Sequence, residues 1–208
     1  MSRVGVVARR KVEVRREEIL SATVKEIASR GVAATRTADV AQALGVSTAL
    51  IFYHFKSKDA LLAQAFAWAA QRDLDRLARA LATGGSALSR LKTALRLYQP
   101  AGSTAPGWTL WVDAWAAALR SPELRRVSKR LDLRWKDTIA DVIAEGVANG
   151  EFRCPDPHGA AWRITALIDG LSVQVTVHKG VLTRKQATEW THEQAAREVG
   201  LDPVDFSS

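Results

Sequence analysis

The sequence predicts an all-α protein of about nine helices, and three observations support this fold class. Apolar residues recur every three or four positions over most of the chain, which is the spacing of one face of a helix. Glycine and proline gather at the ends of these stretches, as at Gly84, Pro100 and Gly150. No stretch shows the apolar–polar alternation of a half-buried strand, and the valine-rich segment 173–181 fits the buried end of a long helix.

Local signals set the expected ends of the first helices. Gly31 and Gly45 stop the first two, because glycine readily takes the left-handed conformation that ends many helices. Thr37 and Ser47 are placed to cap the second and third helices, and Asp39 lies in a first turn, where the helix dipole favours an acid. The predicted ranges are about 13–30, 37–44, 48–55, 58–82, 86–98, 107–119, 123–149, 156–179 and 184–199.

Positive charge is concentrated near the N-terminus. The formal net charge is +8, and residues 1–58 hold eleven Lys or Arg against five Asp or Glu, which is a net +6. This concentration is typical of a nucleic-acid-binding module. A solvated basic surface is the alternative interpretation of the charge taken alone.

Residues 37–55 have the pattern of a helix-turn-helix. Two short helices are joined by a turn at Gly45, and the small Ala41 lies where the helices must approach each other. The N-terminal half of the second helix in such a motif enters the DNA major groove, so Thr48, Ala49 and Tyr53 are expected to face the bases. Packing in an ordinary helical bundle is the alternative.

The helix-turn-helix segment resembles the N-terminal domain of the TetR family of bacterial repressors. The stretches TADVAQALGVS at 37–47 and YHFKSKDALL at 53–62 carry the resemblance. The family usually has tyrosine where this chain has Phe52, so one phosphate hydrogen bond is expected to be missing. The resemblance implies a homodimer that binds a palindromic operator in double-stranded DNA.

The candidate DNA-binding residues lie at or next to the two short helices. Hydroxyls at the helix starts suit phosphate oxygens, and the basic residues after the motif add backbone contacts that position the protein without reading sequence. Few of these side chains can make bidentate base contacts, so methyl contacts and DNA shape are expected to contribute to readout. The candidates are Thr37, Ser47, Thr48, Ala49, Phe52, Tyr53, His54, Lys56 and Lys58.

A basic arm is expected before the first helix. It comprises Arg3, Arg9, Arg10, Lys11, Arg15 and Arg16. Such an arm can reach phosphates or a minor groove, and a disordered, solvating tail is the alternative.

Aromatic residues are concentrated in the C-terminal part. Trp108, Trp111 and Trp115 share one helix face, and Trp135 begins an apolar stripe with Ile139, Val142 and Ile143. The segment WTLWVDAW at 108–115, with Gly146, GEF at 150–152 and LIDGL at 167–171, resembles the C-terminal domain of the BetI-type branch of TetR regulators, which includes choline-responsive repressors. The resemblance implies a ligand cavity among the middle helices and a dimer interface from the last two long ones.

A small-molecule effector of unknown identity is the expected ligand. Aromatic faces with one carboxylate suit a cationic or aromatic-apolar molecule. The candidate ligand-binding residues are Phe66, Trp111, Trp115, Trp135 and Asp169. For each tryptophan, a place in the core is the alternative.

The helix predicted at about 156–179 is apolar almost all round, so we expect it to pack against its copy in a homodimer. Gly170, unfavourable inside a helix, fits a close approach of two backbones there. The last helix is expected to complete the interface through Trp190, Ala195 and Val199.

Other functional classes lack support in the sequence. No Gly-rich phosphate loop, nucleophile elbow or metal-ligand cluster is recognisable, so an enzyme and a cofactor are not expected. Cys154 and His158 are the nearest approach to a metal site, without two further ligands nearby. A single cysteine and no long apolar run favour a cytoplasmic protein without a membrane span.

The expected organisation is a DNA-binding domain at 1–58, comprising the basic arm and three helices, and a ligand-binding and dimerisation domain at 59–208. The expected function is a ligand-responsive transcriptional regulator, with repression released by the effector as the first hypothesis. Ligand-promoted DNA binding would reverse that sign. A constitutive DNA-binding protein without a ligand is the alternative.

Overall fold

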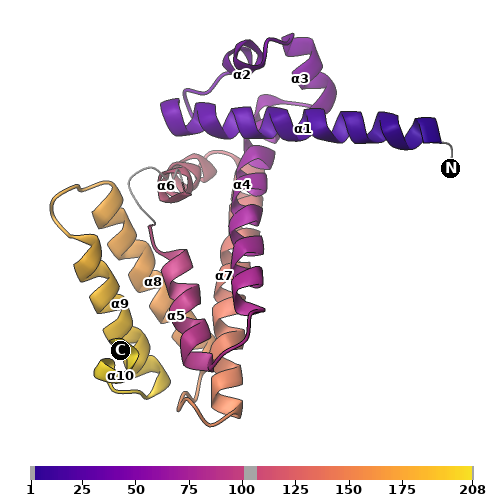
Figure 1. The fold of residues 1–208 in the computed structure, drawn as a ribbon. Coiled ribbons are helices and arrows are strands. Elements are labelled where there is room, and N and C mark those ends of the chain that lie inside the picture. The colour runs from indigo at the N-terminus through magenta and orange to yellow at the C-terminus, as the bar shows by residue number, and fades with distance from the viewer. Residues whose placement is uncertain (1–2, 101–106, 208) are drawn as a thin grey trace. The chain divides into compact units, whose positions relative to one another are not determined.

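The computed structural model describes residues 3–100 and 107–207, and the all-α prediction is confirmed for them: they form ten helices and no strand. Figure 1 shows these helices in chain order. Their bounds are α1 Arg3–Arg30, α2 Thr37–Leu44, α3 Thr48–His54, α4 Lys58–Leu81, α5 Ala87–Tyr98, α6 Gly107–Ala118, α7 Pro122–Ala148, α8 Pro157–Thr176, α9 Arg184–Val199 and α10 Pro203–Ser207. Nine of them correspond to predicted helices, and the short α10 was not predicted.

The N-terminal end of α1 differs from the expectation. The helix starts at Arg3 rather than near residue 13, so the expected arm is a continuation of α1 and the prediction of a segment preceding the first helix was wrong. Residues 3–12 contain no proline and many good helix formers, and nothing in them stops a helix that is already formed downstream. The side chains of Arg3, Arg9, Arg10 and Lys11 lie outside the described part.

The helices form two compact units. The first unit extends to Gln71 and includes Thr109–Lys129, and the second holds the other described residues, from Arg72 onward. Because α4 and α7 are long, each contributes residues to both units. Each unit is described separately below.

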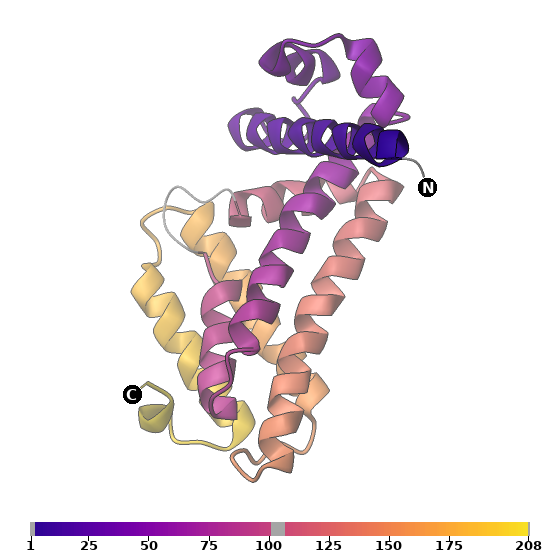
Figure 2. The same ribbon diagram turned by 45° about the vertical axis from the view of Figure 1, so that its right-hand side comes forward.

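In the first unit, α2 packs against both α1 and α3 (Figures 1 and 2). The core of the first unit contains Ile19 of α1, Val40 of α2, Ile51 of α3 and Phe55, each no more than 1% exposed. Gly45 has φ 64° and its N–H donates to the carbonyls of Ala41 and Gln42, which confirms the predicted end of α2.

In the second unit, α8 and α9 pack side by side, and α9 also contacts α5 and α10 (Figure 1). The core contains residues from the four helices α5, α7, α8 and α10: Leu91, Leu95, Ile139, Ile143, Ile164, Ile168 and Phe206, each at most 1% exposed. Ala195 and Val199 of α9 are fully buried in this core, so the expectation that they contribute to a dimer face was wrong. Ala195 and Val199 lie in the interior of a single chain, in which α9 packs against α8 and α10.

One glycine allows a close contact in the second unit. A Cβ atom on Gly146 of α7 would overlap the ring of Phe152 and lie 2.9 Å from Cβ of Ala87. Phe152 is 3% exposed, and the N–H groups of both Glu151 and Phe152 donate to the carbonyl of Gly146. The absence of a side chain at Gly146 therefore lets the turn after α7 fold back onto the helix.

Across residues 3–100 and 107–207, no helix is long and apolar enough to cross a lipid bilayer. Among residues 15–100, 107–204 and 206, whose side chains the structure describes, no group of three or more His, Cys, Asp or Glu is arranged to hold a metal ion. Cys154 is buried and forms no disulfide.

Candidate DNA-binding and ligand-binding sites

Helix α3 begins with the predicted cap. The side chain of Ser47 accepts a hydrogen bond from the N–H of Leu50 at 3.2 Å. This satisfies one of the donors that a helix start leaves open, and it fixes the direction in which α3 begins.

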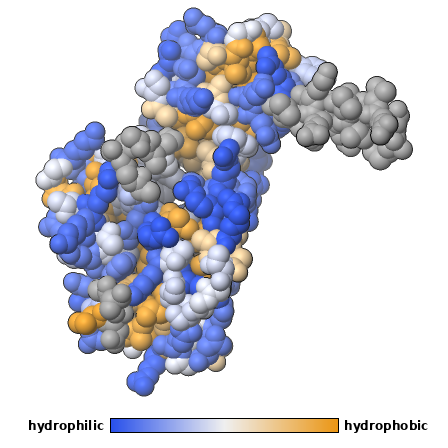
Figure 3. Space-filling view, viewed as in Figure 1, coloured by the Kyte–Doolittle hydropathy of each residue, from blue (hydrophilic) through white to orange (hydrophobic). Residues whose placement is uncertain are grey.

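One face of α3 is open to solvent. Thr48 and Ala49 are exposed, Phe52 is 49% exposed and Tyr53 is 78% exposed, and hydrophobic residues gather among hydrophilic ones over α2 and α3 in Figure 3. Ile51 lies on the opposite side and is fully buried. Burial of Ile51 therefore sets the rotation of α3, and that rotation presents the four predicted contact residues together.

Thr37 does not have the predicted role. It is the first residue of α2, and the cap position belongs to Arg36. The carboxylate of Asp39 accepts from the N–H of Arg36 at 3.2 Å and lies 3.6 Å from the guanidinium of Arg30. Thr37 therefore lies one position after the cap, inside the helix, and it is half-buried.

The basic residues around α3 differ in their surroundings. Lys56 is exposed, whereas Lys58 is half-buried and its ammonium donates to the carbonyl of Ala33 at 3.4 Å. Burial, with the nearby charges of Arg16 and Arg15, lowers the pKa of His54. Both effects disfavour the protonated form of the His54 imidazole.

Two residues of the expected arm make contacts within the first unit. Arg15 pairs with Glu18 at 2.6 Å. The guanidinium of Arg16 lies 4.8 Å from the ring centre of Phe55 and donates to the side chain of Gln64 on α4. Arg16 therefore joins α1 to α4 and to the end of α3, a structural role that the sequence does not indicate.

A hydrogen bond joins α6 to the end of α1. The carboxylate of Asp113 accepts from the N–H of Val32, and it also lies beside Gly31, where a Cβ would approach its oxygen to 3.2 Å. Gly31 has φ 82°, and Val32 is 5% exposed. Asp113 therefore holds the turn that leads into the helix-turn-helix.

The predicted ligand-binding residues fall into two groups. In the first unit, Phe66 of α4 contacts Trp111 of α6 edge-on, with ring centres 4.8 Å apart, and Trp111 lies 5.7 Å from Trp115. Phe66 is fully buried, and both tryptophans are half-buried. Trp111 and Trp115 of this group lie on α6, the helix that also carries Asp113.

The second group lies in the second unit and centres on Tyr98, which sequence reasoning missed. Its ring is 5.1 Å from Trp135 and 6.0 Å from Trp108, and its hydroxyl donates to Asp169 at 2.8 Å. Burial raises the pKa of Asp169 to about 6, although the hydrogen bond from Tyr98 and the charge of Lys136 both act to lower it. Three aromatic rings and a carboxyl group therefore meet at the end of α5.

A buried lysine belongs to the same group. Lys136 is 3% exposed, its ammonium lies 2.6 Å from Asp132 and 4.0 Å from Asp169, and it is 4.9 Å from the ring centre of Trp162. The i, i+4 spacing of Asp132 and Lys136 was the available sequence signal for this pair. Tyr98 had no such signal, because only the fold brings the end of α5 beside α7 and α8.

Comparison with known proteins decides the family. Residues 87–200 match the model of the BetI-type transcriptional repressor C-terminal domain, and residues 19–65 match the tetR family of bacterial regulatory proteins. The chain belongs to the TetR family. Within that family it has the C-terminal domain of the BetI-type branch.

Individual relatives agree with the family match. The HTH-type transcriptional regulator BetI of Burkholderia cenocepacia is 27% identical over 184 residues, covering 87% of this chain and 92% of the relative. The crystal structure of a putative transcriptional regulator from Saccharomonospora viridis in complex with choline is 32% identical, with a TM-score of 0.80, covering 87% of this chain and 95% of that one. A putative TetR-family regulator from Rhodococcus sp. is 31% identical, with a TM-score of 0.74, covering 89% and 97%.

These matches confirm the predicted resemblance to TetR and BetI-type regulators. This TetR-family chain is a transcriptional regulator and not an enzyme. Gly146 and Glu151-Phe152, which carried part of the BetI-type resemblance, are the residues that close the turn after α7.

Proposed function

We propose that this protein is a cytoplasmic, homodimeric repressor that binds a palindromic operator and is released by a small cationic effector. Residues 1–58 bind DNA, and residues 59–208 bind the effector and form the dimer. The observation that supports this most strongly is the open face of α3, with Tyr53 78% exposed beside a capped helix start, in a chain of the TetR family.

The recognition surface consists of the nine predicted DNA-binding residues. Thr48, Ala49, Phe52 and Tyr53 face the major groove, with few groups able to form bidentate base contacts. Ser47, Thr37, His54, Lys56 and Lys58 lie toward the phosphates and position the helix. The hydrogen bond of Lys58 to Ala33 is long at 3.4 Å, so a phosphate can replace it.

The dimer face consists of exposed apolar residues on α8 and α9. Trp162 is 42% exposed, Val177 51% and Trp190 46%, and a Cβ added to Gly170 would meet no atom within 4 Å. Large apolar side chains that are exposed on a folded chain often mark a surface that binds another protein. A two-fold axis through this face would present two α3 helices to the two half-sites of an operator.

The effector is proposed to be a quaternary ammonium compound such as choline, which is bound in the 32% identical structure from Saccharomonospora viridis. Electron-rich rings and a carboxylate bind such cations through cation–π attraction and charge. The proposed ligand-binding residues are Phe66, Trp111 and Trp115 in the first unit, and Trp135 and Asp169, together with Tyr98, in the second unit. A cationic effector would compete with the ammonium of Lys136 for Asp169.

Helix α6 is the proposed link between effector binding and release of the operator DNA. Trp111 and Trp115 lie on the helix that carries Asp113, and Asp113 holds the N–H of Val32 at the entry to the helix-turn-helix. An effector that moves α6 would therefore move the turn before α2. Because coupling is reciprocal, operator DNA would weaken effector binding by the same factor.

The first experiment tests DNA binding. The purified protein is incubated with sheared genomic DNA at moderate salt, and the retained fragments are sequenced. We expect a shared palindrome, lost in a Tyr53→Ala, Lys58→Ala double variant and kept in a Lys179→Ala, Lys185→Ala control. Retention without sequence preference by all three proteins would contradict the proposal.

The second experiment tests the effector on the retrieved operator. Choline is titrated into the protein–operator complex, with sodium chloride as the ionic control. We expect choline to release the DNA and a Trp111→Ala variant to bind DNA without that response. Operator binding that choline and its trimethylammonium analogues leave unchanged would favour the constitutive DNA-binding protein.

A further inference from the structure

Three aromatic side chains follow one another at the end of α3. The rings of Tyr53 and His54 meet edge-on with their centres 5.3 Å apart, and the ring centres of His54 and Phe55 are 6.4 Å apart. Tyr53 is 78% exposed, whereas Phe55 is 1% exposed. The three rings therefore form a series of neighbours that leads from the open face of α3 into the core of the first unit.

Arg16 of α1 contacts the inner end of this series. Its guanidinium carbon lies 4.8 Å from the centre of the Phe55 ring, within the range of a cation–π contact. The same guanidinium donates to the side chain of Gln64 on α4. Figures 1 and 2 both show α1 between the helix-turn-helix and the start of α4. Arg16 therefore connects Phe55 to both of these longer helices.

Helix α3 depends on such contacts for its direction. It has only seven residues, and a helix of this length is not stable by itself. Ser47 caps its start, and Phe55 takes the cap position at its end, where its N–H donates to the carbonyl of Ile51 at 2.8 Å. A side chain that holds the Phe55 ring therefore holds the end of α3 as well.

Arg15, the preceding residue, provides a close comparison. Its guanidinium pairs with Glu18, within α1. The charges of Arg15 and Arg16 both act, after burial, to lower the pKa of His54. The two arginines therefore have similar electrostatic surroundings, whereas the contacts with Phe55 and Gln64 belong to Arg16.

We propose that Arg16 is a positioning residue for DNA recognition. It holds the Phe55 ring, and thereby fixes the end of α3 and the direction of Tyr53, without contacting DNA itself. This role rests on the proposed binding of operator DNA by α3. It differs from the direct phosphate contact expected of a basic arm, because the guanidinium is already bound inside the first unit.

Two variants of equal charge test this role. Arg16→Met and Arg15→Met, each as the full chain, are titrated at the same salt concentration with the retrieved operator and with an unrelated duplex of equal length. We expect Arg16→Met to bind the operator about tenfold more weakly than Arg15→Met does. Both variants should bind the unrelated duplex equally, because each loses one positive charge.

Two results would overturn the proposal. Equal operator affinity of the two variants would show that Arg16 contributes only charge. A loss by Arg16→Met that is the same on the operator and on the unrelated duplex would show a direct phosphate contact, which carries no sequence information.

Arg16→Lys tests the geometry with the charge retained. Lysine can place a cation over the Phe55 ring but lacks the planar guanidinium. We expect its operator affinity to lie between those of wild type and Arg16→Met, with wild-type affinity for the unrelated duplex. Operator affinity as low as that of Arg16→Met would also fit positioning, whereas wild-type operator affinity would show that charge alone is sufficient and overturn the proposal. This variant also carries the test if Arg16→Met does not fold.

A double-variant cycle with Gln64→Met tests the link to α4. Gln64→Met removes the acceptor of the Arg16 hydrogen bond without changing the charge. We expect it to weaken operator binding in wild type and to have little further effect in Arg16→Met, because both changes break the same contact. Additive losses would contradict a shared role.

Failure of the proposed function would give a different result. Wild type that binds the operator and the unrelated duplex alike would contradict operator recognition by α3, and the role of Arg16 with it. Wild type that prefers the operator, together with an Arg16→Met variant of unchanged preference, would overturn the role of Arg16 alone.

Discussion

The carboxylate of Asp113 accepts a hydrogen bond from the backbone N–H of Val32, so α6 and the end of α1 are joined at one buried point. Asp113 is on the same helix as Trp111 and Trp115, and Val32 precedes the helix-turn-helix by a few residues. This relationship gives the α6 tryptophans a route to DNA binding within the first unit.

Removing this carboxylate should loosen the turn before α2. Asp113→Ala leaves the N–H of Val32 buried without a partner, which costs about 1–3 kcal/mol. We expect a lower free energy of unfolding and faster hydrogen exchange at the Val32 amide, measured by denaturant titration and NMR. Asp113→Asn, which keeps an acceptor oxygen, is the control and should lose less. Equal exchange in all three proteins would show that the bond does not hold the turn.

The dimer face makes Gly170 a selective test position. A Cβ there meets no atom of the same chain within 4 Å, so Gly170→Arg should leave the fold of one protomer intact. We expect the dimer dissociation constant, measured by analytical ultracentrifugation, to rise at least tenfold, because a buried interface does not accept an unpaired charge. Ala144→Arg, at an exposed position of α7, is the control. A dimer equally stable in both variants would place the interface elsewhere.

The pKa of Asp169 predicts a pH dependence of stability. Burial raises this pKa from 3.8 to about 6, so between these pH values the folded protein binds a proton that the unfolded chain releases. The protonated Asp169 carboxyl therefore makes its full contribution to the unfolding free energy below about pH 4, and this contribution is lost as the pH rises through 6.

Comparison with Asp169→Asn isolates this effect. As pH rises from 4.5 to 7, wild type should lose up to about 2 kcal/mol of unfolding free energy relative to the variant, since one pKa unit corresponds to about 1.36 kcal/mol. Denaturant titrations at several pH values measure the difference. Parallel pH profiles for the two proteins would show that the carboxyl does not titrate in this range.

Gly146 should tolerate no side chain while Phe152 remains. Gly146→Ala forces the ring of Phe152 or the backbone of α7 to move, and such overpacking costs about 1–3 kcal/mol. In a Phe152→Leu background the same change should cost less, because the smaller side chain leaves room. Unfolding free energies of the four proteins give the coupling between the two positions, and zero coupling would contradict the steric account.

Much of the fold and of the DNA-binding element could be predicted from the chain alone. Gly45 and Ser47 act through their own backbone neighbours, so their roles in ending α2 and capping α3 do not depend on distant residues. Thr37 was wrong as a cap because α2 begins one residue earlier than expected, with Arg36 at the cap position and Asp39 accepting from the N–H of Arg36. A sequence shows several residues that could cap a helix, but it does not show which of them takes the cap position.

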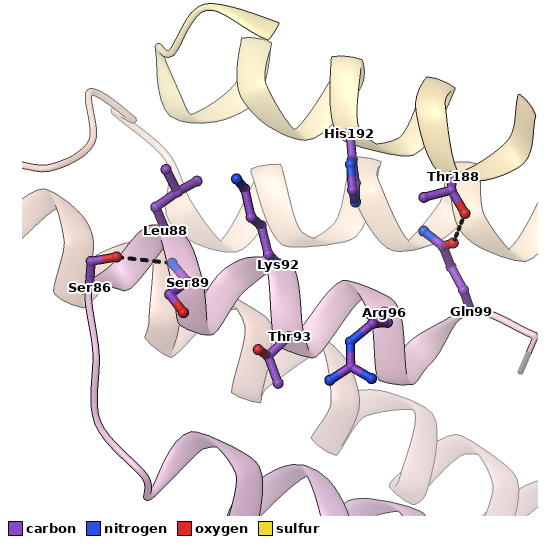
Figure 4. Close-up of a pocket in the computed structure, with 9 residues that line it drawn as sticks. All are labelled: Ser86, Leu88, Ser89, Lys92, Thr93, Arg96, Gln99, Thr188 and His192. Atoms are coloured by element: carbon purple, nitrogen blue, oxygen red, sulfur yellow. Dashed lines mark hydrogen bonds between the residues drawn. The ribbon is translucent and has the colours of Figure 1, made fainter. Parts of the chain in front are cut away.

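The candidate ligand site was only partly predictable. Trp111 and Trp135 belong to periodic apolar stripes, which a sequence reveals. Tyr98 and Lys136 were missed, because their importance comes from Asp169, which is far from both along the chain and adjacent in space. A pocket between α5 and α9 was not predicted either, because its lining residues lie at 86–99 and 188–192 and meet only in the folded chain (Figure 4).

The sequence by itself determined the all-α class, the order of nine helices and the helix-turn-helix pattern, because periodicity, caps and glycine stops act over a few residues. Only the tertiary structure decided that Ala195 and Val199 are buried, that Asp113 holds Val32, and that Lys136 and Tyr98 converge on Asp169. These features depend on contacts between helices, and the free energy of packing, rather than local propensity, selects which faces meet.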